Sequence, residues 1–116
     1  MTITRIDPGK RYSAAVIHNN TVYLAGQVAQ KTVGKSVGEQ TTEVLENIEA
    51  LLVKVGSAKN KILNIQIFLP DISKFAEMNV AYDKWVPQDA MPARATVEAK
   101  IATPGEDIEI IVVAAL

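Results

Sequence analysis

The 116-residue chain contains no cysteine and only one histidine, His18. Without cysteine it cannot form disulfides, use a thiolate nucleophile or bind a metal through sulfur. A lone histidine cannot build a multi-histidine metal site within one chain. These two absences exclude disulfide-stabilised folds, cysteine-dependent enzymes and metal centres that need several histidines of one chain.

The chain also lacks a surplus of either charge and any long apolar run. Twelve Lys and Arg residues against thirteen Asp and Glu residues give a net charge of −1, which does not fit the basic patch of a nucleic-acid-binding protein. The polar opening MTITRIDPGKRY has no apolar signal-peptide core, and the apolar stretch 108–116 is far too short to span a membrane. We therefore expect a soluble cytoplasmic protein with no nucleic-acid or membrane partner.

The sequence does contain enough apolar residues for a packed core. Hydrophobic residues make up 48% of the chain, which argues against disorder. A chain of this length has room for one interior, because a second domain would bury too little surface to support itself. We expect a single domain spanning residues 1–116.

Periodicity predicts two helices. Between residues 39 and 55 apolar side chains recur at helical spacing along one face, and Gly56 stands where a left-handed residue ends a helix. A second helix is predicted from Ser73, as a cap residue, to about residue 86. Its buried stripe is expected to consist of Phe75, Met78, Tyr82, Trp85 and Val86.

Alternating and β-branched segments predict strands on either side of these helices. The strands are expected at 11–17 and 21–27, joined by a turn at 18–20, at 62–69 with Leu63 on the apolar face, and at 93–101 and 107–116, joined by a tight turn at 103–106. The order ββ(β)αβαββ indicates an α/β (α+β) fold, a sheet with two helices on one face. The other face needs cover, so the pattern also predicts an oligomer.

Arg94 stands out because it follows Pro92 and Ala93 at the start of a predicted strand. A guanidinium can present two parallel donors to a carboxylate, a geometry that lysine does not match. The alternative is a solvated cation at a strand edge or a structural ion pair. The pattern alone leaves both interpretations open.

Glu109 is the one acid within the apolar run 108–116. Because burying a carboxylate without a partner is costly, it either lies at a sheet edge or has a function as a general acid or base. Plain structural roles are expected for four further residues: Glu98 facing solvent, Tyr23 packing, His18 in a surface turn and Asn79 on a helix edge, pointing to water.

The predicted turn at 103–106 has a geometric consequence. A tight hairpin would place Glu109 opposite about Lys100, on the same face as Arg94 but roughly 20 Å along the strand. One small substrate cannot bridge that span. We therefore expect Arg94 and Glu109 to share a site only if they come from different subunits or if the hairpin register is irregular, and we favour the first.

Several short segments, in this order and spacing, indicate a family. They are Tyr12–Val16, Val22–Gln27, Gln40–Thr41, Val44–Ile48, Phe68–Asp71, Phe75 with Met78–Asn79, Pro92–Glu98 and Glu109–Ile110. On these segments the chain resembles the YjgF/Rid (reactive intermediate deaminase) family along nearly its whole length. The opening MTITRID and the Ala114–Ala115 ending look like the branch of the bacterial YoaB proteins.

The resemblance implies a chorismate-mutase-like fold, a homotrimer with three clefts between subunits, and hydrolysis of reactive 2-imino acids to 2-keto acids and ammonia without a metal or organic cofactor. In the family the arginine of the Pro-Ala-Arg motif, here Arg94, holds the substrate carboxylate. The glutamate that follows it, here Glu109, positions the attacking water. Tyr12 and Gly26 match residues that line the same cleft, and Asn79 matches a family asparagine near the second helix.

Two positions depart from the family pattern. Thr96 stands where many members have cysteine, and Ala25 stands where many have serine before the Gly-Gln pair. Neither change removes the groups needed for water addition, and Thr96 remains an expected substrate-binding residue. Both changes leave the substrate preference open.

Two other functions stay open on the sequence. A carboxylate-binding or regulatory trimer without turnover would use the same Arg94. RNA cleavage or translation inhibition is named for some relatives, but the near-zero net charge and the single histidine weigh against it.

Overall fold

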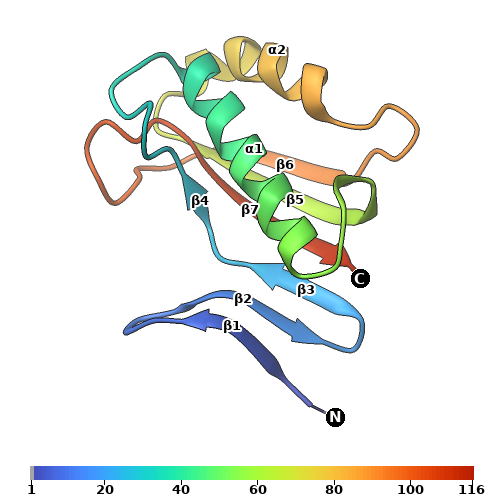
Figure 1. The fold of residues 1–116 in the computed structure, drawn as a ribbon. Coiled ribbons are helices and arrows are strands. Elements are labelled where there is room, and N and C mark those ends of the chain that lie inside the picture. The colour runs from blue at the N-terminus through green and yellow to red at the C-terminus, as the bar shows by residue number, and fades with distance from the viewer. Residues whose placement is uncertain (1) are drawn as a thin grey trace.

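The computed structural model describes residues 2–116, so Met1, the first residue of the MTITRID opening, lies outside the described residues. A seven-stranded mixed sheet carries two α-helices on one face (Figure 1). The elements, with two short 3-10 helices η1 and η2, follow in chain order: β1 Thr4–Pro8, β2 Ser13–His18, β3 Thr21–Leu24, β4 Gln27–Val28, α1 Val37–Lys54, η1 Lys59–Lys61, β5 Ile62–Leu69, η2 Ile72–Lys74, α2 Phe75–Trp85, β6 Ala93–Glu98 and β7 Glu109–Ala115. The predicted α+β class, with both helices on one face, is confirmed.

The last strand of the chain lies at the centre of the sheet. The strand order is β1-β2-β3-β7-β5-β6, and the short β4 also pairs with β7. The pairing of β5 with β6 is parallel, with α2 as the crossover, and the other pairings are antiparallel. β1 and β6 are therefore the two edge strands.

The prediction that strands 93–101 and 107–116 form a hairpin is wrong. The turn itself is present: the Glu106 N–H donates to the Thr103 carbonyl at 3.2 Å, and Gly105 has a φ of 87°. However, β5 lies between β6 and β7 and pairs with both. β5 occupies this position because its Ile65, Ile67 and Leu69 are fully buried beneath the helices, so β6 is left at the edge and ends at Glu98.

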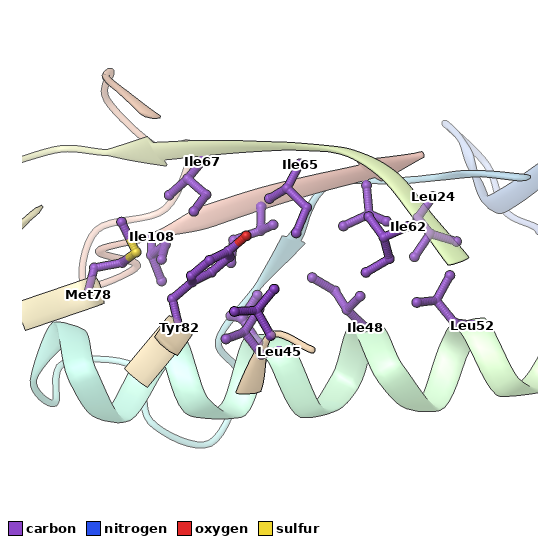
Figure 2. Packing of buried hydrophobic residues seen from close by; sticks show 14 of the residues in the cluster. Leu24, Leu45, Ile48, Leu52, Ile62, Ile65, Ile67, Met78, Tyr82 and Ile108 are labelled. Atoms are coloured by element: carbon purple, nitrogen blue, oxygen red, sulfur yellow. The ribbon is translucent and has the colours of Figure 1, made fainter. Parts of the chain in front are cut away.

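The core lies between α1, α2 and the helix-facing side of β5 and β7. Figure 2 shows side chains of α1 pointing toward those of β5: Leu45, Ile48 and Leu52 against Ile62, Ile65 and Ile67. Each fully buried Leu or Ile stabilises the fold by about 1.5–3 kcal/mol. This layer positions β7, which carries Glu109, and β5, which pairs with the strand that carries Arg94.

Helix α1 begins two residues before the predicted start because Ser36 caps it. The Ser36 hydroxyl accepts from the Glu39 N–H at 3.1 Å, as an N-cap serine does. The helix ends as predicted, with Gly56 in the left-handed region at a φ of 90°. Across residues 2–116, neither α-helix is at once long and apolar enough to cross a bilayer.

Three further details correct the sequence interpretation. Leu63 is 52% exposed, because an irregularity in the β5–β7 register between Ile62 and Asn64 turns Ile62 into the core instead. Ser73 does not cap α2; Asp71 accepts from the Ser73 N–H at 3.0 Å and caps the preceding 3-10 turn, η2. The polar opening forms β1, an exposed edge strand that alternation could not reveal.

A carboxylate on α1 holds the loop between β4 and α1. Glu43 accepts from the Thr32 hydroxyl at 2.6 Å and from the backbone N–H groups of Gln30, Lys31 and Thr32 at 2.9–3.2 Å. These bonds, with the Thr32 hydroxyl first, lower the pKa of Glu43 from its ordinary value of 4.5 to about 2. The ionised carboxylate therefore favours the folded chain.

We expect Glu43→Ala to lower the free energy of unfolding by about 1–2 kcal/mol at pH 7, toward the weaker end for charged hydrogen bonds because the site is partly exposed. A lowered folded pKa means that this stabilisation is full above pH 4.5 and is lost as the pH falls toward about 2. Urea unfolding at several pH values measures it. The control is Glu46→Ala on the exposed side of the same helix; an equal loss in both variants contradicts the assignment.

Candidate functional site

The six predicted site residues form two groups on opposite faces of the sheet. Directly paired residues in neighbouring strands point to the same face. Arg94 pairs with Ile65, which is fully buried beneath the helices, so Arg94 faces α2. Glu109 pairs with Phe68, whose neighbours along β5 are buried, so Glu109 points away from the helices. The predicted placement of both groups on one face is wrong.

Arg94 lies between two aromatic rings of α2. Its guanidinium carbon lies 4.6 Å from the centroid of the Tyr82 ring and 5.6 Å from that of Phe75. Its Nη1 donates to Oδ1 of Asn79 at 2.8 Å, so the expectation that Asn79 points to water is wrong. Phe75, Asn79 and Tyr82 follow the i, i+4, i+7 spacing that places side chains on one face of a helix. Cation–π contact and one hydrogen bond hold the guanidinium in a defined orientation.

No carboxylate neutralises Arg94 within residues 2–116, where the ion pairs are Lys54 with Asp7 and Lys59 with Glu49. The interpretation of Arg94 as part of a structural ion pair is therefore wrong. Asn79 is neutral and uses one guanidinium nitrogen. A half-buried guanidinium with donors to spare is suited to bind an anion, above all a planar carboxylate.

Tyr82 and Phe75 have different surroundings on the two sides of the guanidinium. Tyr82 is buried at 5% exposure, and burial raises the pKa of its hydroxyl, an effect that the Arg94 charge partly opposes. The ring therefore stays a neutral phenol. Phe75 is 40% exposed, so its prediction as a core residue is wrong: it covers the guanidinium at the surface instead.

Thr96 lies on the same side of β6 as Arg94, two residues further along and paired with Ile67. Its hydroxyl oxygen is buried and has no hydrogen-bond partner within residues 2–116. A buried hydroxyl without a partner costs about 1–3 kcal/mol. On the Arg94 side of the sheet, the Thr96 hydroxyl is thus a second polar group that can still form a hydrogen bond.

The other group of predicted residues lines one open cavity of about 550 Å³. It is lined, among others, by Tyr12, Ala25, Gly26, Thr103, Glu106 and Glu109. Tyr12 is 73% exposed, so its ring is free to contact a ligand. Within residues 2–116, no three acidic or histidine side chains gather as metal ligands.

Gly26 is a glycine because Glu109 occupies the space of its side chain. A Cβ at Gly26 would clash with Oε2 of Glu109 and lie 3.0 Å from its carboxyl carbon. Real Cβ atoms essentially never come that close to another atom. The Gly-Gln pair therefore leaves room for the carboxylate to lie against the backbone at the cavity wall.

Arg94 does not line this cavity, and the sheet explains why. Arg94 pairs with Ile65 of β5, and Glu109 pairs with Phe68 of the same strand. These two partners are three residues apart along β5, roughly 10 Å. Arg94 and Glu109 are also separated by the width of β5 and face opposite sides. One chain therefore does not bring these two groups together around one small molecule.

The remaining candidates have simple positions. Glu98 is exposed, as predicted, and accepts from the Ile72 N–H at 3.1 Å. Tyr23 was expected to pack but is 48% exposed on β3, because no helix covers that side of the sheet. His18 ends β2, next to a turn in which Asn19 and Asn20 adopt the predicted positive φ.

Two residues of the Arg94 site were missed as functional residues. Phe75 and Tyr82 follow the helical spacing of an apolar stripe, and the same spacing includes Asn79. A polar residue within an aromatic stripe is the signal that could have indicated a cation beneath it. What the spacing could not show is which strand lies below the helix.

The sheet face opposite the helices is uncovered in residues 2–116 and partly apolar, with Gln66 and Glu109 as polar members. On β6 the side chains of Ala93, Ala95 and Val97 are exposed, as is Glu98 at its end, whereas Arg94 and Thr96 are half-buried. On β6 the polar side chains of Arg94 and Thr96 therefore face the helices, and the apolar ones face away from them. Such a strand exposes apolar surface that favours contact with another protein surface.

Comparison with known proteins gives a consistent family. The family model described as endoribonuclease L-PSP matches residues 2–116. The chain is 50% identical over 114 residues to a RutC family protein of Haemophilus influenzae, covering 98% of both chains. It is 45% identical over 116 residues to the RutC family protein YoaB of Escherichia coli K12, covering 100% of both.

Solved structures agree with the fold. A member of the YjgF protein family from Neisseria meningitidis superposes with a TM-score of 0.95 at 38% identity, over 99% of this chain and 95% of that one. A protein described as a putative translation initiation inhibitor from Salmonella typhimurium gives a TM-score of 0.90 at 42% identity, over 99% and 98%. The arrangement of sheet and helices is thus shared with these proteins.

We expect Gly26→Ala to push the Glu109 carboxylate aside into the open cavity and to cost at most about 1 kcal/mol of stability, below the range for an overpacked core, because the clashing atoms are the far end of a flexible side chain. In a Glu109→Ala background the clash is gone and the cost should fall to near zero. Thermal unfolding of the four proteins in this double-mutant cycle measures the coupling. Equal costs in both backgrounds would show that the carboxylate does not lie against Gly26.

Proposed function

Because the chain belongs to the endoribonuclease L-PSP family, also named YjgF, Rid and RutC, and to its YoaB-like branch, we propose that it hydrolyses reactive 2-imino acids to 2-keto acids and ammonia. In this proposal Arg94 binds the substrate carboxylate, and Glu109 acts on the attacking water. Tyr12, Gly26, Asn79 and Thr96 complete the substrate site. No metal or organic cofactor takes part.

The observation that carries the proposal is the state of Arg94. Its guanidinium is half-buried, held by two rings and one neutral amide, and paired with no carboxylate in residues 2–116. A preorganised guanidinium loses little conformational entropy when it binds a ligand. Its planar donors match the carboxylate that every 2-imino acid carries.

Glu109 supplies the group that the hydrolysis needs. Its carboxylate takes a proton from water as the water oxygen attacks C2 of the imine, and returns that proton to the imine nitrogen, which gives a neutral carbinolamine. The carboxylate then takes the proton of the carbinolamine hydroxyl and delivers it to the amino nitrogen as the C–N bond breaks, so that ammonia and the 2-keto acid leave and the carboxylate is regenerated. Orientation by Arg94 contributes the rest of the acceleration, since the imine already reacts with water unaided.

The two half-sites require a second copy of the chain. In one chain Arg94 and Glu109 lie on opposite faces of the sheet, about 10 Å apart along the strands. A cyclic homotrimer with clefts between neighbours would bring the Arg94 face of one protomer to the Glu109 cavity of the next. The uncovered, partly apolar face of the sheet supports this assembly, because it offers the surface for such contacts.

We expect the wild-type chain to have the mass of three chains in solution and Val97→Glu to dissociate it, because the substitution places a charge on the uncovered sheet face. Light scattering coupled to size-exclusion chromatography measures the mass. Val80→Glu is the matched control: Val80 is 58% exposed on α2, on the helix side, against 47% for Val97. Dissociation of both variants or of neither would contradict the assigned face.

We expect Arg94→Ala to lower kcat/KM for 2-iminobutanoate by about 100-fold or more, since a paired charge in a site is worth about 2–5 kcal/mol. Arg94→Lys should recover little, because lysine lacks the planar pair of donors and the stacking contact. The assay couples an amino-acid oxidase to keto-acid formation in the presence of semicarbazide as the competing trap. Arg5→Ala, on the edge strand, is the control; wild-type rates in Arg94→Ala remove the assignment.

Mixed assemblies test whether two chains share a site. Arg94→Ala and Glu109→Ala are each expected to be inactive, but their one-to-one mixture, refolded together, should recover about a quarter of the wild-type rate. An intact site needs Arg94 from a Glu109→Ala chain and Glu109 from a neighbouring Arg94→Ala chain. In a one-to-one mixture each of these two positions holds the required variant with a chance of one half, so one site in four is intact. No recovery in assembled mixtures contradicts the shared site.

RNA cleavage, the activity in the description of the family model, is the competing proposal. A net charge of −1 does not favour binding of a polyanion. Incubation of the purified protein with labelled RNA, before and after Arg94→Ala, separates the two activities. Cleavage that survives repeated purification and is lost in the variant would favour the competing proposal.

A further inference from the structure

A loop between β6 and β7 forms one wall of the Glu109 cavity. Thr103 and Glu106 line the cavity, and the loop leads directly into Ile108 and Glu109. Ile108 is fully buried and anchors the end of the loop in the core. The position of the Glu109 carboxylate therefore depends on how firmly residues 102–107 are held.

One fully buried polar side chain, Gln40 of α1, holds this loop. Its Nε2 donates to the carbonyls of Gly105 at 2.9 Å and Lys35 at 3.1 Å, and its Oε1 accepts from the Asp107 N–H at 2.9 Å. Gln40 has no exposed surface. Both of its amide donors and its carbonyl are thus used to tie two loops to the first turn of the helix.

The loop is constrained by a second contact next to the first. The Gly34 N–H donates to the same Gly105 carbonyl at 3.0 Å. Gly105 has a φ of 87°, and a Cβ there would lie 3.0 Å from Cγ1 of Val33. The two loops therefore pack backbone against backbone, and the Gln40 amide bonds to both of them.

We propose that Gln40 is a positioning residue that fixes the 102–107 loop and thereby places the Glu109 carboxylate for water attack, which rests on the function proposed above. The amide reaches Asp107, two residues before Glu109. A buried amide is costly unless all its groups are bonded. The three bonds explain why a polar residue occupies a core position. The bond to Asp107 connects that position to Glu109 through the chain.

The test replaces Gln40 by methionine, which keeps the length of the side chain and removes the three hydrogen bonds. We expect kcat for 2-iminobutanoate to fall about 10- to 100-fold, the effect of a displacement of roughly 1 Å. KM should change less than about threefold, because in the proposed assembly the substrate carboxylate is held by Arg94 of a neighbouring protomer, which Gln40 does not contact. Both constants are measured well below the melting temperature of the variant.

The matched control is Thr41→Val. Thr41 is also fully buried, is adjacent to Gln40, and donates its hydroxyl to the Val37 carbonyl at 2.7 Å, a bond within the helix. Valine has nearly the same shape, so this variant loses one buried hydrogen bond without touching the loop. It should keep the wild-type kcat. An equal loss of kcat in both variants would reduce Gln40 to a stabilising residue and overturn the proposal.

Amide hydrogen exchange gives a readout that does not need turnover. In Gln40→Met the backbone amides of Thr103 and of residues 105–109 should exchange about tenfold faster or more than in the wild type, and in Thr41→Val they should not. If the wild-type chain does not hydrolyse imines, the proposed function fails, while the exchange data still decide whether Gln40 holds the loop. Unchanged exchange in Gln40→Met overturns the inference.

If Gln40→Met does not fold, Gln40→Asn takes its place. Asparagine keeps the amide but is shorter by one methylene, so it cannot reach Lys35, Gly105 and Asp107 together. The same fall in kcat and the same faster exchange are expected. A wild-type kcat in this variant would overturn the proposal.

Discussion

The β5–β7 ladder is the pairing on which the rest of the structure depends. β5 also pairs with β6, so the two strands that carry Arg94 and Glu109 lie on its two sides. The helix-facing side chains of β5 and β7 form the core with α1. Because that face is full, the acid of β7 must lie on the opposite face, whereas Arg94, on the edge strand, extends beneath α2. The separation of the two groups follows from this pairing.

Arg94 keeps its charge available because aromatic rings, not carboxylates, hold it. A salt bridge would have satisfied the guanidinium and removed its capacity to bind an anion. Tyr82 and Phe75 provide orientation through their π faces, and Asn79 uses one of the nitrogen donors. The same device leaves the guanidinium incompletely satisfied in one chain, which is the physical basis for assigning it a ligand.

Helix α1 has two roles at once. Its apolar face packs on the sheet, and its first turns hold the loops around the cavity through Gln40 and Glu43. Two polar side chains three positions apart thus bind the loop before the helix and the loop before β7. The core and the cavity wall are consequently connected through one rigid element.

Much of the local structure could be predicted from the sequence, because it depends on neighbouring residues. Helical spacing located α1, Gly56 ended it, and alternation located β5. The failures share a different cause. Leu63 and Ile62 exchange faces because of a register irregularity, and Phe75 leaves the core because a guanidinium lies below it. Each depends on a partner from a distant part of the chain.

The sequence by itself determined the class of fold, the family and the residues on which the proposed chemistry rests, since periodicity and short motifs are local properties. Tertiary structure alone decided that β5 separates β6 from β7, and so that Arg94 and Glu109 face opposite sides. Strand order cannot be deduced from a strand's own residues, because pairing is a contact between segments far apart in the chain. For the same reason the free guanidinium and the loop held by Gln40 became visible only in the folded molecule.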